Sequence, residues 1–433
     1  MNMCCYKKAP AALKHIPQPR KTAAHTSLRK LPFSLQTYRC VSRKNVSRFG
    51  SASVCNIIAS GYGGVLMEQV DVVVVGGGVV GLATAAHLAD EHEVFLLERR
   101  QYLGEEQSGR NSGVVHAGVY YEPASLKARL CVLGNRLMYK FCAEHGVPCA
   151  RVGKFIVAAS ERQISDLLSL YRRAKRIGAR GVHIVTPQEL LAAEPNIHCH
   201  LALHFPSTGI VDAATLIRKL ASLARQRNAT ILTSATVTRL QKHPKGVLLE
   251  VQYPQNRTEQ VLARKVVNAA GLHSAQLART LNPSIRFSIS PVRGEYYSYI
   301  IRDEALRIRA NIYPAPPIMR VGQQERFIVG IHLTPTFDLL PDGSCKLSRR
   351  VLVGPSATPT NDPTDFSPPR LPPQHFTDAV KAFFPQLTPQ MLQPEYSGVQ
   401  AKLSQFNDFA IFRDPSCPNC VHAIGVDSPG LTS

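Results

Sequence analysis

The chain has 433 residues, 44% of them hydrophobic, so it is long enough to bury more than one core. No run of 18 or more apolar residues occurs, which argues against a membrane-spanning helix and leaves at most peripheral membrane contact. The net charge of +21 is unevenly distributed, because residues 1–67 hold eleven Lys or Arg and no acid. The remaining 40 basic and 30 acidic residues are scattered, which argues against a nucleic-acid-binding surface.

The first 66 residues form a basic leader. It contains Arg and Ser but no acidic residue, and it lacks the apolar stretch of a secretory signal. This composition predicts an organelle transit peptide, and segments such as RKTAAHTSLRK suit import into mitochondria. A disordered basic arm that binds nucleic acid or anionic lipid is the alternative. The folded part of the chain is expected to begin near Met67.

The segment after Met67 has the order of a nucleotide-binding βαβ unit. The β-branched run Val70–Val75 predicts a strand buried on both faces of a parallel sheet. A G-x-G-x-x-G sequence follows at residues 76–81, and apolar residues at helical spacing come after it. A second predicted strand, residues 93–97, leads into Glu98, 17 residues after the last glycine. This order of elements predicts a dinucleotide site.

Each glycine of this unit has a physical role. Gly76 permits a tight turn, Gly78 lets a pyrophosphate approach the backbone at the positive helix N-terminus, and Gly81 permits close packing of helix on strand. Glu98 can accept hydrogen bonds from a ribose, which disfavours the 2′-phosphate of NADP. These residues alone leave both NAD and FAD open.

A glycine-rich segment, SGRNSGVVHAGVYY at residues 108–121, follows the βαβ unit and contains one histidine, His116. Such a stretch can lay backbone N–H groups and short side chains against a cofactor. The imidazole of His116 is suited to accept a proton near neutral pH. A structural histidine that bonds a backbone carbonyl is the alternative.

Further elements follow in chain order. A helix is predicted over residues 212–225, with Asp212 as its N-cap. The proline-rich segment 355–374 is predicted to be a loop. Strands are predicted within residues 229–240, 246–253, 264–271, 296–301, 327–332 and 410–412.

The eleven cysteines are odd in number and irregularly spaced, so they do not indicate a disulfide framework. The sequence CPNC at residues 417–420 lacks the second pair or the histidines of a zinc site. Its prolines do not suit the helix that follows a thioredoxin motif. It is predicted to be a loop with two ordinary thiols, and no metal site is predicted.

Motifs from Val70 onward resemble those of one flavoprotein family. They are SGRNSGVVHAGVYYEPASLKARLCVLGNR from residue 108, GKFIVA at 153–158, STGIVDAATL at 207–216, VVNAAGLHS at 266–274, PVRGEYY at 291–297, NIYPAP at 311–316 and VGIHLTPT at 329–336. In this order they resemble the mitochondrial-type FAD-dependent L-2-hydroxyglutarate dehydrogenases of the D-amino-acid oxidase-like superfamily. The resemblance favours FAD over NAD as the cofactor.

The resemblance implies an α/β plus α+β fold. A Rossmann-like FAD-binding domain would be built from discontinuous segments, and a substrate domain would surround an antiparallel sheet. The expected FAD-binding domain comprises residues 67–150, 205–283 and 392–433, and the expected substrate domain comprises residues 151–204 and 284–391. Residues 1–66 would be the leader.

The resemblance also assigns residues to the cofactor. Small residues in VVNAAGLHS would let the backbone pass close to FAD, as would the glycine-rich segment and a turn near the C-terminus. The residues expected to bind FAD are Gly76, Gly78, Gly81, Glu98, Arg110, Asn111, Ser112, Ala270, Gly271 and Gly430.

In the family's reaction, the Cα hydrogen of a 2-hydroxy acid leaves as hydride to the flavin, while a base accepts the hydroxyl proton. The resemblance places His116 at the flavin, and we predict that it is this base. The alternative of a structural histidine stays open for this residue.

The two carboxylates of such a substrate require cations or several donors. Arg293, Lys402 and Lys127 are candidates, and Arg293 is favoured because PVRGEYY surrounds it. His332 and Tyr313 could donate from the face of the sheet. The alternatives are that the charged groups are solvated at the surface and that His332 and Tyr313 only pack.

Two features depart from the family pattern. Superfamily members commonly carry Gly-x-Arg near the C-terminus, where this chain has Gln400, and glutamine brings no charge. The family turn that contains Gly430 leads into a helix facing the flavin, and this sequence stops at Ser433. We expect Lys402 to compensate for Gln400, or the substrate to differ, or turnover to be impaired.

Three functions follow as hypotheses. The first is oxidation of L-2-hydroxyglutarate to 2-oxoglutarate in mitochondria, with electrons passed to a non-oxygen acceptor such as a quinone. The second is oxidation of another 2-hydroxy acid or an amino acid by a related flavoprotein. The third is a catalytically impaired flavin-binding protein. The expected partners are a small-molecule substrate and an electron acceptor, without nucleic acid and with at most peripheral membrane association.

Overall fold

The β-branched run after Met67 forms a central strand in the computed structural model, which describes residues 69–321, 324–327, 329–341 and 344–433. This strand is β1 (Gln69–Val75), and its last four residues are buried. Val72 and Val74 pack into one hydrophobic cluster, whereas Val73 and Val75 pack into another on the opposite face. The prediction of a strand buried on both faces is therefore confirmed. The leader, residues 1–66, lies outside the described residues.

The first sheet contains β1 at its centre, with parallel neighbours on both sides. Among the described residues it has eight strands, and β10, β11 and β12 form an antiparallel extension. The strand order is β10 (Thr236–His243), β11 (Gly246–Gln252), β12 (Thr258–Asn268), β1, β2 (Val94–Leu97) and β9 (Thr230–Leu232), with β22 (Cys420–Ile424) parallel to β12 and antiparallel to β21 (Ala410–Arg413).

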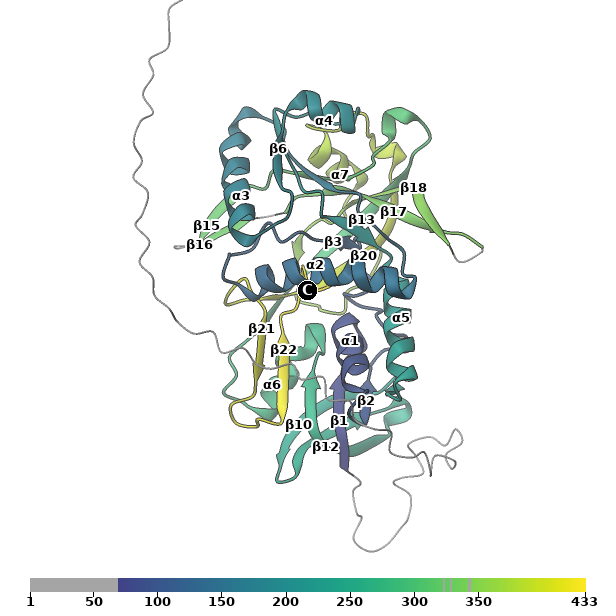
Figure 1. Cartoon of the computed structure of the whole chain (residues 1–433). Coiled ribbons are helices and arrows are strands. Elements are labelled where there is room, and N and C mark those ends of the chain that lie inside the picture. The colour runs from purple at the N-terminus through teal and green to yellow at the C-terminus, as the bar shows by residue number, and fades with distance from the viewer. Residues whose placement is uncertain (1–68, 322–323, 328, 342–343) are drawn as a thin grey trace, which may run out of the picture. The chain divides into compact units, whose positions relative to one another are not determined.

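Helices cover both faces of this sheet. Helix α1 (Val79–Leu88) lies beside α5 (Ala213–Gln226) on one face (Figure 1). Helix α6 (Ser274–Leu281) contributes to the cluster on the other face. The side chain of Asp212 accepts a hydrogen bond from the backbone N–H of Thr215 at 2.7 Å, so the predicted N-cap of α5 is confirmed.

The second sheet is mostly antiparallel. In the described part of the chain it has nine strands, and β5 with β14 is its parallel pair. The order is β19 (Thr358–Pro359), β13 (Ile289–Ile300), β18 (Cys345–Gly354), β17 (His332–Leu339), β14 (Asn311–Pro314), β5 (Lys154–Ala158), β7 (Leu201–His204) and β6 (His183–Val185), and β20 (Gln393–Leu403) pairs with β13.

One face of the second sheet, which includes Phe155 and Val157, packs against α7 (Pro373–Val380) and α4 (Pro187–Ala193). The opposite face, which includes Ile156 and Ala158, packs against α3 (Ile164–Ile177). Helix α2 (Leu126–His145) contributes residues to the clusters of both sheets. Smaller pieces complete the fold: β3 (Val114–Val115), β8 (Gly209–Val211) and β4 (Cys149–Ala150) form one small sheet, β15 (Ile318–Val321) pairs with β16 (Gln324–Phe327), and short 3-10 helices occupy Glu161–Gln163, Pro254–Asn256, Gly271–His273, Glu304–Leu306 and Pro389–Met391.

The predicted fold class is confirmed, because a Rossmann-like α/β sheet is combined with a largely antiparallel sheet. The first sheet draws its strands from separated parts of the chain. The division into two domains stays a prediction. Strand β20 pairs with β13 of the second sheet, although it lies in a segment, residues 392–433, expected in the FAD-binding domain.

One predicted strand is wrong. Residues 329–331 have no regular structure, because β16 ends at Phe327 and β17 begins at His332. The side chain of His332 bonds back to the carbonyl of Gly330, so this carbonyl has a partner outside a strand ladder. The CPNC sequence at residues 417–420 forms a turn that leads into β22, and both of its thiols are free.

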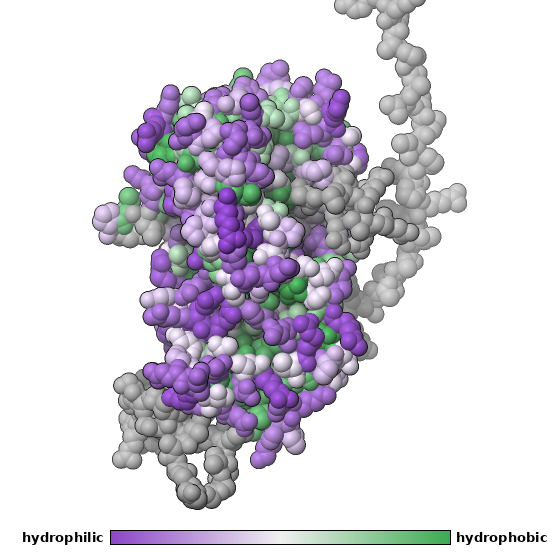
Figure 2. Space-filling view, turned by 180° about the vertical axis from the view of Figure 1, so that it is seen from behind, coloured by the Kyte–Doolittle hydropathy of each residue, from purple (hydrophilic) through white to green (hydrophobic). Residues whose placement is uncertain are grey.

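On the face seen in Figure 2, hydrophilic residues dominate the described surface and hydrophobic ones are scattered among them. No helix among the described residues is long and apolar enough to cross a membrane.

Candidate active site

The G-x-G-x-x-G turn brings backbone to the edge of a cavity. Gly76 has a φ of +109°, and a Cβ atom there would overlap the carbonyl oxygen of Ala269 in the chain segment after β12. A Cβ atom at Gly81 would overlap the carbonyl oxygen of Gly76, so helix α1 can pack this closely only with glycine. Gly78 is the N-cap of α1, which directs the positive end of the helix at the cavity.

Glu98 follows β2 and is 9% exposed. One of its carboxylate oxygens accepts from the backbone N–H of Gly77 and the other from that of Arg100, both at 2.6 Å. Burial raises the pKa of Glu98, and these two backbone hydrogen bonds oppose the shift. The carboxylate is thus held at the cavity wall, and its remaining lone pairs can accept hydrogen bonds from a ribose.

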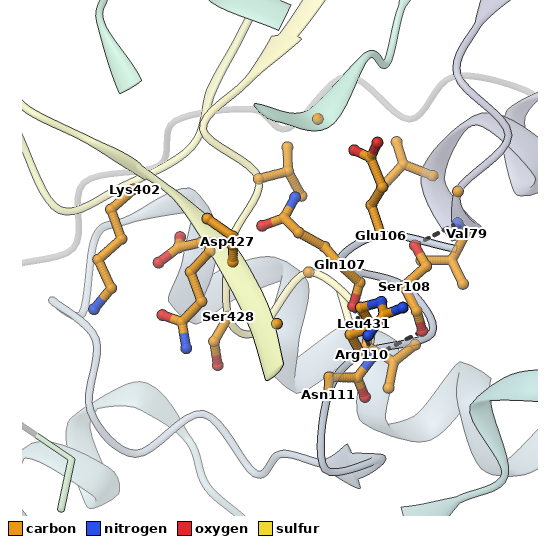
Figure 3. Close-up of a pocket in the computed structure, with 18 of the residues that line it drawn as sticks. Val79, Glu106, Gln107, Ser108, Arg110, Asn111, Lys402, Asp427, Ser428 and Leu431 are labelled. Carbon is orange, nitrogen blue, oxygen red and sulfur yellow. Dashed lines mark hydrogen bonds between the residues drawn. The ribbon is translucent and has the colours of Figure 1, made fainter. Parts of the chain in front are cut away.

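The glycine-rich segment after β2 forms a tightly bonded loop. Asn111 closes it by accepting from the N–H of Gly113 at 2.8 Å and donating to the carbonyl of Ser108 at 2.7 Å. Ser108 accepts from the N–H of Val79 at 3.0 Å, which ties the loop to α1. Figure 3 shows Ser108 next to Val79, with Arg110 and Asn111 further along the same loop.

A cavity of about 790 Å³ connects these features. It is lined by every residue predicted to bind the cofactor except Gly81, which packs one layer behind: Gly76, Gly78, Glu98, Arg110, Asn111, Ser112, Ala270, Gly271 and Gly430. The same cavity reaches residues of the second sheet, among them Tyr313 and His332. One cavity therefore extends from the nucleotide-binding turn to the second sheet.

His116 lies on the wall of this cavity, directly after β3. Its backbone is fixed at both ends, because its N–H donates to the Thr432 hydroxyl at 3.0 Å and its carbonyl accepts from Asn135 at 3.0 Å. Nε2 lies 3.5 Å from the Ser428 hydroxyl, and Nδ1 has no hydrogen-bond partner among the described residues. Burial holds the pKa of His116 well below its usual range, and electrostatic interactions with Lys154 and His332 lower it further.

His332 faces the same cavity from the start of β17. Its ring stacks on Tyr313 with centroids 3.8 Å apart, and Nδ1 lies 3.0 Å from the carbonyl of Gly330. Burial lowers the pKa of His332 to about 3, so the ring is neutral. Since the carbonyl needs a donor, we assign the proton to Nδ1, which leaves the lone pair of Nε2 as an acceptor. Through Nε2, His332 is thus placed to accept a hydrogen bond; the sequence left open whether it would donate one or only pack, and its ring does pack on Tyr313.

Arg293 lies away from the cavity lining. Its buried guanidinium pairs with Glu295 and lies 3.4 Å from Asp365, and it donates to the carbonyl of Ser367 at 2.8 Å. These contacts fasten the proline-rich segment to β13 and use the charge internally. The expected role of Arg293 in binding a substrate carboxylate is not supported by this position.

The two lysine candidates do line the cavity. Lys402 is an exposed residue of β20, and Figure 3 shows its side chain on the same side as Asp427 and Ser428. Lys127 is buried and paired with Asp427 at 2.6 Å, so its charge is already compensated. Gln400 also lines the cavity, two residues before Lys402 on the same strand and therefore on the same face. Lys402 can thus bring a charge to the part of the site where Gln400 brings none.

Sequence reasoning misses Lys154, the first residue of β5. It is fully buried, and its ammonium lies over the rings of Tyr120 and Tyr313, each 4.8 Å away. Both tyrosines line the cavity. A signal exists in the sequence, since a lysine begins the apolar run KFIVA, but the same pattern describes a lysine at the exposed end of a strand.

The nucleotide end of the cavity fits FAD. Its edge is made of glycine backbone and a helix N-terminus, which suit a pyrophosphate. Glu98 suits the ribose, and the small residues Ala270 and Gly271 allow close approach of a flat ring system. Among the described residues, no group of three or more metal-ligating side chains is placed to hold an ion.

The site and fold define a nucleotide-dependent redox protein. Residues 71–433 match the family of FAD dependent oxidoreductases, and the chain belongs to that family. Its cofactor is FAD.

Three similar proteins from different organisms carry the same name. The chain is 31% identical to L-2-hydroxyglutarate dehydrogenase, mitochondrial, of Arabidopsis thaliana, over 88% of this chain and 85% of that protein. It is 33% identical to the protein of that name in Nematostella vectensis, over 68% of this chain and 67% of the relative. The Homo sapiens protein is 33% identical over 62% of this chain, and the matched region spans 58% of that relative.

Solved structures share the fold. Reduced L-alpha-glycerophosphate oxidase from Mycoplasma pneumoniae with FAD bound superposes with a TM-score of 0.72 and 27% identity, over 84% of this chain and 92% of that one. Glycine oxidase from Geobacillus kaustophilus gives a TM-score of 0.67 at 21% identity, over 84% of this chain and 91% of that one, which shows the fold alone.

Proposed function

We propose that this protein oxidises L-2-hydroxyglutarate to 2-oxoglutarate with FAD and passes the electrons to an acceptor other than oxygen. The carrying observation is that His116 and His332 lie on the wall of a cavity whose other end fits FAD. The relatives at 31–33% identity support the choice of substrate. Bound FAD would supply the two-electron acceptor for the Cα hydrogen, and the chain must handle the hydroxyl proton.

His116 is the proposed acceptor of that proton. Because its pKa is held well below the usual value, the imidazole is neutral at physiological pH and can take up a proton. Its backbone hydrogen bonds to Thr432 and Asn135 fix where the ring stands, so the base needs little reorganisation. His332, through Nε2, is a further acceptor that can orient the substrate hydroxyl.

The substrate carries two carboxylates, which need positive charge or donors. We propose that Lys402 meets one of them, because it lines the cavity and stands two residues from Gln400 on the same strand. A glutamine at position 400 can donate a hydrogen bond but contributes no charge. This arrangement leaves a different 2-hydroxy acid or an amino acid as the competing substrate class.

The proposal is tested by anaerobic reduction of the bound flavin. We expect L-2-hydroxyglutarate to bleach the oxidised flavin absorbance, while D-2-hydroxyglutarate, L-lactate and L-glutamate act at least about tenfold more slowly, since a misplaced Cα hydrogen or a missing polar partner costs that much. Stopped-flow absorbance measures the rates. Faster reduction by another compound would replace the proposed substrate. FAD-loaded protein that none of these compounds reduces would favour a flavin-binding protein without this activity.

We also propose that the protein is mitochondrial and that a quinone is one suitable acceptor. The basic, acid-free leader and the names of the relatives support the location. Residues 1–66 fused to a fluorescent reporter are expected to direct it to mitochondria. A matched fusion in which Arg20, Arg29, Arg39 and Arg43 are replaced by Gln should stay diffuse, and mitochondrial signal from both fusions would reject charge-dependent import.

A further inference from the structure

Lys154 is a buried lysine, and no carboxylate among the described residues pairs with it. The side chain is 0% exposed, and its Nζ makes no hydrogen bond with any residue that the structure describes. Removing an ammonium group from water costs several kcal/mol unless other interactions compensate. The position of Lys154 therefore requires an explanation beyond the packing of β5.

Aromatic rings surround the ammonium group on several sides. Nζ lies 4.8 Å from the ring centres of Tyr120 and Tyr313 and 5.3 Å from that of Phe205. Such contacts stabilise a cation only in part. Tyr120 and Tyr313 line the cavity, and Tyr313 stacks on His332. The positive charge of Lys154 thus stands one side chain behind the cavity wall.

The titratable groups near Lys154 come from four parts of the chain, and the fifth part around it contributes Phe205, which does not titrate. They are Tyr120 and His116 after β3, Cys131 of α2, Tyr313 of β14 and His332 of β17. Burial raises the pKa of Tyr120 and Tyr313 and raises that of Cys131 to about 12, whereas both histidines have lowered pKa values. Near neutral pH none of these groups is negatively charged, so none of them neutralises the ammonium group of Lys154.

We propose that Lys154 is a specificity-determining residue whose buried charge attracts dianionic ligands into the end of the cavity lined by Tyr120, Tyr313 and His332. This inference rests on the proposed function, since it names what selects a dicarboxylate. Lys154 acts through space, behind the aromatic wall, so it is a positioning residue and not a catalytic one. A charge that acts through space discriminates by the net charge of the ligand, and the low-dielectric surroundings preserve its effect.

The test compares two inert probes that differ by one carboxylate, glutarate and pentanoate, bound to the FAD-loaded protein in isothermal titration calorimetry. Lys154→Met is expected to weaken glutarate binding about tenfold and pentanoate binding about threefold, the effect of a unit charge at several ångström in a protein interior. Lys154→Arg keeps the positive charge and should therefore retain most of the preference for glutarate over pentanoate. Lys381→Met, which removes an exposed lysine from the end of α7, is the matched control and should change neither affinity.

The pH profile of the unmodified protein provides an independent measurement if Lys154→Met fails to fold. Burial lowers the pKa of Lys154 to about 7, so its charge is present below pH 7 and is lost as the pH rises through that value. Both carboxylates of glutarate are ionised above pH 6. Glutarate affinity should therefore fall between pH 6 and 8.5, and pentanoate affinity should fall less.

The outcomes separate this inference from the proposed function. Reduction of the flavin by L-2-hydroxyglutarate tests the function without reference to Lys154. A folded, FAD-containing Lys154→Met protein with unchanged glutarate affinity would overturn the role of Lys154. Equal losses for both probes, not restored by Lys154→Arg and accompanied by a flat pH profile, would assign Lys154 to packing and overturn it as well.

Discussion

His116→Ala is expected to retain FAD and to slow anaerobic flavin reduction by L-2-hydroxyglutarate about a hundredfold or more, the size of a general-base contribution. The fold should persist, because the contacts of His116 with Thr432 and Asn135 use backbone atoms that alanine keeps. The loss should appear in the limiting rate of reduction, with little change in the apparent dissociation constant of the substrate. Single-turnover absorbance over a range of substrate concentrations separates the two quantities.

The pH dependence of the same rate is a second test of His116 as the base, because the direction of the change with pH is predicted. A base with a lowered pKa is neutral above that value, so the limiting rate of the unmodified protein should be level at and above pH 6.5 and fall only at lower pH. His375→Ala, which removes an exposed histidine of α7, is the matched control and should leave the rate unchanged. A His116→Ala protein that reduces at the normal rate would return His116 to a structural role.

The nucleotide end of the site is predictable from the sequence because its determinants are local. The turn at Gly76 and Gly78 and the acid at Glu98 belong to one βαβ unit, in which spacing along the chain fixes spacing in the fold. The cap at Asp212 is equally local, since donor and acceptor lie three residues apart. Short-range sequence patterns therefore predict both the strands and helices of this end and the class of ligand that it binds.

The second end of the cavity is harder to predict, because its residues meet through the tertiary fold. Lys154 becomes buried only when Tyr120, Phe205 and Tyr313, from three other parts of the chain, close around it. Arg293 suits a carboxylate in sequence, yet Asp365, 72 residues further on, and Glu295 on its own strand take its charge. No local sequence pattern distinguishes a lysine that becomes buried beside a ligand cavity from a lysine at the solvent-exposed end of a strand.

The strand predicted over residues 327–332 fails for a related reason. Its apolar residues suit a continuous strand, but residues 329–331 have no regular structure and the carbonyl of Gly330 bonds the side chain of His332. That irregular backbone lets His332 face the cavity beside Tyr313. The local rule is thus broken at a residue that we assign to the substrate end.

Gly81→Ala is expected to abolish stable FAD binding, with an affinity at least about a hundredfold weaker than that of the unmodified protein. The added Cβ would overlap the carbonyl oxygen of Gly76, and backbone atoms cannot swing aside as a flexible side chain can. Helix α1 must then move away from β1, which displaces its N-terminus from the pyrophosphate position. Flavin absorbance of heat-released cofactor, followed by titration of the apoprotein with FAD, measures the loss.

Gly178→Ala is the matched control for this change. Gly178 follows the last residue of α3, and no atom lies within 4 Å of the Cβ that alanine would add. Its φ of +86° makes alanine cost about 1 kcal/mol of folding free energy, so thermal stability should fall slightly while FAD content stays normal. The contrast distinguishes a steric block at the nucleotide from a general loss of stability. Normal FAD affinity in Gly81→Ala would show that α1 can shift without harm and would contradict the role of this glycine.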